Sequence, residues 1–249
     1  MSLTLITIIT VLVVLASIHV GHWLYGYMKR SSTGTLIEPS ASAIGAMMGL
    51  LAFMLAFAFS MGAHRLDVRK QLSLEEMNAI GTLHMRADLL PATESSTVKS
   101  LLVEYTKLRV DLSKNVELLK VTLTRSDEIN GELWSIVSTY LIAHPNDLSA
   151  LALIEATNAV IDIFGARVYA GTQHIPIIIW TVLVAMTILA MIAMGYQMGV
   201  SGRMSNLLSI IMALTFSAVL VLIADLDRYD QGFFALPKQP MIDFYESIK

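Results

Sequence analysis

The fold is decided by residues 41–70, which read ASAIGAMMGLLAFMLAFAFSMGAHRLDVRK. Up to Ala63 this stretch is apolar and free of charged residues, so as a helix it is long enough to cross about 30 Å of hydrocarbon. The charged residues Arg65, Asp67 and Arg69 then follow within five positions. A long apolar helix that ends in a charged collar is typical of a transmembrane span. These residues therefore predict a membrane protein.

Three further stretches have the same length and composition, with no charged residue in their middle: residues 3–24, 175–196 and 207–224. The whole chain is 15% charged, against about 25% for a soluble domain, and its mean hydropathy is +0.64. Its 17 basic and 20 acidic residues give no basic surface, so nucleic acid is not expected as a partner. The absence of cysteine excludes disulfides, thiol catalysis and thiolate metal sites.

The four spans predict an all-α membrane protein built from two hairpins. The first hairpin occupies residues 1–63, with spans 3–24 and 41–63, and the second occupies residues 174–224, with spans 175–196 and 207–224. Residues 64–173 form a helical segment between spans two and three, and residues 225–249 form a C-terminal tail. Six basic residues flank the spans on the side of this segment and three on the other side. Because cytoplasmic flanks are richer in Lys and Arg, we expect the segment and both termini in the cytoplasm.

The segment between spans two and three carries a helical stripe of apolar residues. Its members recur at steps of three and four: Val98, Leu101, Tyr105, Leu108, Leu112, Val116 and Leu119. Such a stripe is typical of helix bundles and coiled coils, and it favours self-association. Pro91 and Pro145 interrupt the segment, and Asp147 is a candidate N-cap. We expect spans two and three to continue as helices beyond the membrane, with two more helices between them.

Span two carries two distinctive faces. Gly45, Gly49, Ala52 and Ala56 form a small-residue face, which allows transmembrane helices to pack closely. The adjacent face carries a series of larger and polar residues: Phe53, Phe57, Ser60 and His64. One interpretation is ordinary packing, with the phenylalanines in lipid or in the core. The other is a pore helix in which rings of phenylalanine form an apolar neck that gates by dewetting.

Charged residues outside the spans suggest two further sites. A polar collar, which is either a solvated boundary or a connected network at a pore mouth, contains His64, Arg65, Asp67, Glu75, Glu76, Asn78, Arg86 and Asp88. Arg86 is a candidate partner for Asp225 or Asp227. With Asp230, these two carboxylates could supply oxygen ligands to Ca²⁺, or they could simply mark the membrane boundary. No other cofactor is expected. No catalytic motif is present, so an enzyme is not expected.

Four runs of sequence resemble the bacterial bestrophin-like membrane proteins, formally a domain of unknown function. The longest is SMGAHRLDVRKQLSLEEMNAIGTLHMRADLLP at residues 60–91. The others are IEATNAVIDIFGAR at 154–167, LIADLDR at 222–228 and QPMIDF at 239–244. The resemblance implies a four-span fold in the bacterial inner (plasma) membrane. Bestrophins, distant relatives of this family, are pentameric anion channels that bind Ca²⁺ after the last span, and their second span lines the pore.

By that resemblance the expected function is a homo-oligomeric, pentameric ion channel that conducts anions, with Phe53 and Phe57 in the neck. Its partners would be the lipid bilayer, further copies of the chain and the permeant ions. Two other hypotheses stay open. A stator-like energy-coupling protein has a similar layout but needs a partner subunit with an intramembrane carboxylate. A membrane scaffold or sensor would not conduct at all.

Overall fold

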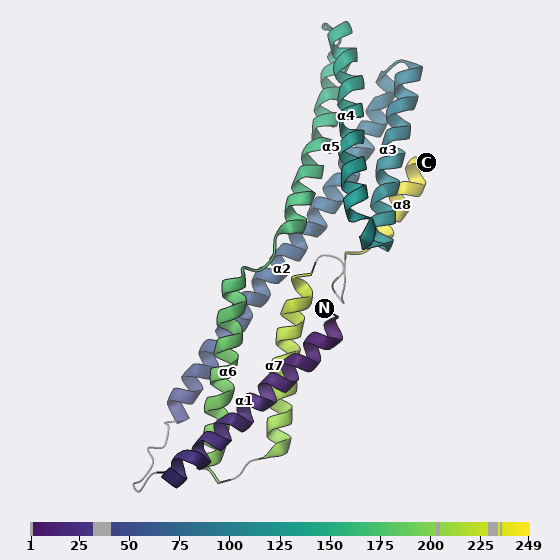
Figure 1. Cartoon of the computed structure of the whole chain (residues 1–249). Helices are drawn as coiled ribbons and strands as arrows, with labels where there is room; N and C mark the ends of the chain where they lie inside the picture. Colours follow the sequence, from purple (N-terminus) through teal and green to yellow (C-terminus); the bar gives the residue numbers. More distant parts are fainter. Residues whose placement is uncertain (1, 32–40, 203–204, 229–233, 235) are drawn as a thin grey trace. The chain divides into compact units, whose positions relative to one another are not determined.

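The computed structural model describes residues 2–31, 41–202, 205–228, 234 and 236–249 (Figure 1). Gly34 and Pro39, which lie between the first two apolar runs of the sequence, are therefore outside the described residues. The main helices are α1 (Leu3–Ser31), α2 (Ala41–Arg86), α3 (Ala92–Lys114), α4 (Leu119–Ala143), α5 (Leu148–Thr172), α6 (Ile177–Val200), α7 (Asn206–Leu226) and α8 (Gln239–Ile248). Short 3₁₀ turns, Ala87–Leu89 and Val116–Leu118, flank α3. Across the described ranges no strand is found, which confirms the all-helical class.

Four helical stretches are long and apolar enough to cross a membrane. They lie in Leu3–Ser31, Ala41–Leu89, Leu148–Val200 and Asn206–Leu226, and each contains a window of mean hydropathy between 2.1 and 2.7. Each contains one predicted span, so four apolar helices that could cross a membrane are confirmed, while their pairing into two hairpins stays a prediction. The cytoplasmic location of the segment between spans two and three stays a prediction.

The chain divides into two compact units, each described by itself. The span unit comprises Met1–Leu66 and His174–Phe234, and the bundle unit comprises Asp67–Gln173 and Ala235–Lys249. Helix α2 begins in the span unit and ends in the bundle unit. The bundle unit thus joins the predicted middle segment with the end of the chain.

In the span unit, α1 packs against α6 and α7. Glycines make the first contact close: a Cβ atom at Gly21 would overlap the carbonyl of Ile192, and one at Gly195 would overlap the carbonyl of Ile18. The approach of backbones through glycine is the usual way in which transmembrane helices gain packing contacts. The sequence predicted such packing on α2, at Gly45 and Gly49. A Cβ atom at either of these two glycines would meet no atom of the described residues within 4 Å.

In the bundle unit, α4 packs between α3 and α5, and α8 packs on α3. The core contains Ile80, Leu102, Leu133 and Leu153, all fully buried, and Phe244 of α8 packs against it. The predicted helices between α2 and α5 are confirmed as α3 and α4. Their apolar stripe was placed correctly only in its first half.

The stripe departs from the prediction after Leu108, which still packs against the core. Arg109 and Val110 are buried on α3, whereas Leu112 is only half-buried. Leu119 belongs to the next helix and is exposed. The physical reason is that a straight helix turns every 3.6 residues and drifts from a strict seven-residue repeat. The helix also ends at Lys114, before the predicted stripe does.

Span three does not continue without interruption into the bundle unit. Helix α5 ends at Thr172, and α6 begins after Pro176, which has no backbone N–H to donate. Two side chains form hydrogen bonds with the backbone groups around this break. Arg69 donates hydrogen bonds to the carbonyls of Ala170 and Gln173 at 3.3 and 2.8 Å, and Asp227 accepts one from the Ile175 N–H at 2.7 Å.

Candidate functional site along helix α2

Within the span unit, α2 buries one face and exposes the opposite one. Leu51, Leu55 and Ala58 are buried in the core, whereas the side chains of Phe53 and Phe57 are 65% and 49% exposed. Since successive helical residues are about 100° apart, Phe53 and Phe57 point away from the face that holds the buried residues. Ser60 and His64 are exposed on the same side as the phenylalanines.

The small-residue face lies beside the phenylalanines and is also exposed. Gly45, Gly49, Ala52 and Ala56 are all open on the surface of the chain. The two alanines line an apolar groove of about 400 Å³ between α2 and α7. Both predicted faces of α2 are therefore still exposed among the described residues of a single chain.

The exposed surface of α2 differs in composition from that of the other candidate spans. The other helices expose mainly long aliphatic side chains, such as Leu12 of α1, Val184 of α6 and Leu214 of α7. Such residues are the ones that lipid tails favour. Helix α2 also exposes Met47 and Leu50, but the rest of its exposed surface combines small, hydroxyl and aromatic residues. The small and hydroxyl residues fit contact with protein or with a lumen better than contact with lipid, whereas the phenylalanines fit either.

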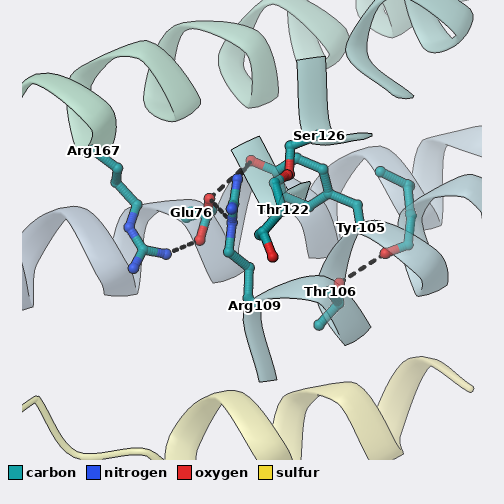
Figure 2. Close-up of polar contacts among 8 residues, drawn as sticks. Glu76, Tyr105, Thr106, Arg109, Thr122, Ser126 and Arg167 are labelled. Carbon is teal, nitrogen blue, oxygen red and sulfur yellow. Dashed lines mark hydrogen bonds and ion pairs between the residues drawn. The ribbon is translucent and has the colours of Figure 1, made fainter. Parts of the chain in front are cut away.

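In the bundle unit, Glu76 of α2 lies at the centre of a buried charged cluster. Figure 2 shows its carboxylate between Arg167 of α5 on one side and Arg109 and Tyr105 of α3 on the other. The Glu76 Oε1 atom accepts hydrogen bonds from Tyr105 Oη at 2.9 Å and from Arg109 Nε at 3.1 Å. Arg167 Nη1 donates to Glu76 Oε2. Glu76 is fully buried and Arg109 nearly so.

The rest of the cluster is closed by aromatic rings. Arg109 Nη2 donates to Tyr105 Oη at 2.8 Å, and its guanidinium lies 4.5 Å from the Tyr105 ring centre and 5.3 Å from that of Phe164. Burial raises the pKa of Tyr105 well above its ordinary value, and the Glu76 charge raises it further. Burial lowers the pKa of Arg109, but Glu76 and Tyr105 outweigh this effect and the net pKa is raised. Both groups therefore keep their protons at neutral pH, and Tyr105 stays a hydrogen-bond donor.

The other residues of the predicted collar do not join this cluster. Arg86 donates to the Ala152 carbonyl at 2.6 Å and lies 3.6 Å from the Glu155 carboxylate, so its described partners are on α5. Its pairing with Asp225 or Asp227 stays a prediction. Asp88 pairs with Lys99 at 2.5 Å. The remaining members stay at the surface or its edge: Asp67, Glu75 and Asn78 are exposed, and Arg65 is half-buried. One of the Arg65 guanidinium nitrogens, Nη1, is buried without a hydrogen-bond partner among the described residues.

The acidic side chains at the end of α7 accept hydrogen bonds from backbone N–H groups. Asp225 accepts a hydrogen bond from the Phe234 N–H at 3.3 Å, and Asp227 accepts the one from Ile175. Asp230 lies outside the described residues. Within the described ranges no three His, Asp or Glu side chains come close enough together to hold a metal ion. The calcium site stays a prediction.

Sequence reasoning missed the partners of Glu76. Arg109 and Arg167 are 33 and 91 positions away from it, so no local pattern connects them. One signal was present: Tyr105 and Arg109 are four residues apart on the buried face of α3, where an apolar pair would be usual.

Comparison with known proteins identifies the family. A family model described as the bestrophin-like domain matches residues 8–241. The chain belongs to the bestrophin-like family. A search of curated proteins gave no match.

Solved structures share the bestrophin-like fold. A bacterial bestrophin homologue from Klebsiella pneumoniae, phased with zinc, is 16% identical and superimposes with a TM-score of 0.73 over 99% of this chain and 97% of that one. A point variant of the same homologue gives a TM-score of 0.75 at 16% identity, over 100% and 97% of the two chains. At this identity the likeness concerns the fold alone.

Proposed function

We propose that this protein is a bestrophin-type ion channel in which several copies, most simply five, surround an axis lined by α2. In this arrangement Phe53 and Phe57 of each copy form two apolar rings about one helical turn apart. Membership of the bestrophin-like family supports the channel class. The observation that carries the pore assignment is that Phe53 and Phe57 point away from the chain's own core, beside an exposed face of small residues on α2.

The apolar rings would act as the neck of the pore. A narrow apolar constriction offers water few hydrogen-bonding partners, so it empties readily and raises the barrier to ions. Ser60, one turn further along α2, supplies hydroxyl groups below the neck. Arg65 lies about one further turn along α2 and would favour anions at that end of the pore, while Asp67 nearby partly offsets its charge.

Replacement of the neck residues tests the proposal. The Phe57→Ala variant widens the neck, so we expect its current in planar bilayers to increase roughly two-fold or more over the unmodified protein. Leu214→Ala, on the exposed surface of α7, is the matched control and should leave the current unchanged. If neither the unmodified protein nor the Phe53→Ala/Phe57→Ala double variant conducts any ion, the channel proposal fails. Replacement of chloride by a large organic anion then tests selectivity by the shift of the reversal potential.

A further inference from the structure

No described residue fills the apolar groove of the span unit. Its walls are Ala52, Ala56 and Phe59 of α2 and Phe216 and Val219 of α7. Thr215 also borders it, but its hydroxyl already donates to the Ile211 carbonyl at 2.9 Å. The groove therefore offers shape and apolar contact, with no hydrogen bond to satisfy.

A complementary surface lies on the other flank of the same helix. Met47 and Leu50 are 38% and 55% exposed, and they project from α2 as long, unpacked side chains. At about 100° per residue, Leu50 and Ala52 lie roughly 160° apart around the helix. The Phe53 and Phe57 face lies between the two flanks. Helix α2 thus carries a protruding flank and a grooved flank on either side of its aromatic face.

We propose that, in the assembly described above, Leu50 and Met47 of one copy occupy the groove between α2 and α7 of the next copy. This inference rests on the proposed function and assigns the interface that it needs. Two different surfaces that fit one another make a head-to-tail contact, which closes into a ring when the rotation allows. The placement of the phenylalanine face between them directs those side chains toward the axis of such a ring. Tight packing of side chains into small-residue grooves is the main source of association between transmembrane helices.

Cysteine cross-linking tests this interface directly because the native chain contains no cysteine. In the Leu50→Cys/Ala52→Cys variant, the two thiols of one chain face opposite ways and cannot bond to each other, whereas those of neighbouring copies meet. Their heights along parallel helices differ by only about 3 Å, which a disulfide can span. Oxidation in nanodiscs should convert most of the protein into a ladder of covalent oligomers that reductant reverses. The Met47→Cys/Gly49→Cys variant, nearly one turn earlier, should give the same ladder. It provides an independent test if the first variant does not fold.

The controls separate the possible results. Leu50→Cys alone, Ala52→Cys alone and Leu50→Cys/Leu214→Cys should remain monomeric on a denaturing gel. Dimers formed by a single-cysteine variant would overturn the inference, because they indicate a contact between identical surfaces. The absence of a ladder while native mass measurement still finds an oligomer would overturn this interface but not the channel, and lipid would then fill the groove. A monomer by native mass would remove the proposed function itself.

Discussion

In the span unit, α1 and α6 approach each other through glycines, whereas in the bundle unit α2, α3 and α5 meet around a charged cluster. The first contact depends on the absence of side chains. The second depends on a carboxylate that is removed from water and compensated by two guanidinium groups and a phenol. A helix in lipid gains little from burying apolar surface, so it relies on close packing. The bundle unit has an apolar core of its own and holds a buried charge where three of its helices meet.

Removal of the central carboxylate is expected to have the largest effect. The Glu76→Ala variant leaves Arg109 buried without its counter-charge, and loss of one partner in a buried ion pair costs about 3–5 kcal/mol. We expect a much lower melting temperature for the bundle unit in detergent, followed by circular dichroism. Glu75→Ala, at the exposed neighbouring position, is the control and should change stability by less than about 0.5 kcal/mol. Equal melting temperatures for the two variants would mean that the cluster contributes nothing.

A methyl group at the closest helix contact should have the next largest effect. In Gly195→Ala the new Cβ meets the Ile18 carbonyl, so α1 and α6 must separate, at a cost of about 1–3 kcal/mol. Gly26→Ala on α1 is the control because no atom lies near that position, and the better helix propensity of alanine should leave the protein equally or more stable. Thermal unfolding in detergent distinguishes the two. A neutral Gly195→Ala would show that the glycines do not set the helix spacing.

A substitution in the bundle unit should act in the opposite direction. Asn130 of α4 is buried, and neither its amide oxygen nor its nitrogen has a hydrogen-bond partner among the described residues. Asn130→Leu removes this cost, so we expect a gain of about 1 kcal/mol in unfolding free energy. The exposed Asn158→Leu serves for comparison and should give no such gain. A loss of stability in Asn130→Leu would indicate that the amide is hydrogen-bonded in the protein, for example to a buried water.

The smallest expected effect concerns pH. Burial lowers the pKa of His84, the Lys99 charge lowers it further, and Asp88 opposes this shift. Because the folded state holds the proton less tightly than the unfolded state, stability is complete above the ordinary histidine pKa of about 6.5 and falls below it. Between pH 7.5 and 5.5 we expect His84→Gln to lose less stability than the native chain, by less than about 0.5 kcal/mol. Parallel melting curves for both proteins at the two pH values check this.

The spans could be predicted from the sequence because length and hydropathy are local properties, and each apolar run is long enough to be unambiguous. The two exposed faces of α2 could be predicted from helical spacing. Their contacts could not, because these are made with further copies of the chain or with lipid. The charged cluster could not be predicted, since Glu76, Arg109 and Arg167 come together only when three helices pack. The break before α6 had a visible cause in Pro176, but the side chains that satisfy it, Arg69 and Asp227, come from elsewhere in the chain.

The position of α8 has a consequence for biosynthesis. After α1, the residues of α2 to α5 are translated, then the two apolar helices α6 and α7, and only then the helix whose Phe244 lies against the α2 position Gly81. At about 5–20 residues per second, the bundle core waits several seconds for its last element while two spans enter the membrane. During that interval the core surface that Phe244 covers lacks this last side chain. Helix α8 is therefore made after both apolar helices α6 and α7, yet it completes a core that α2 to α5 begin.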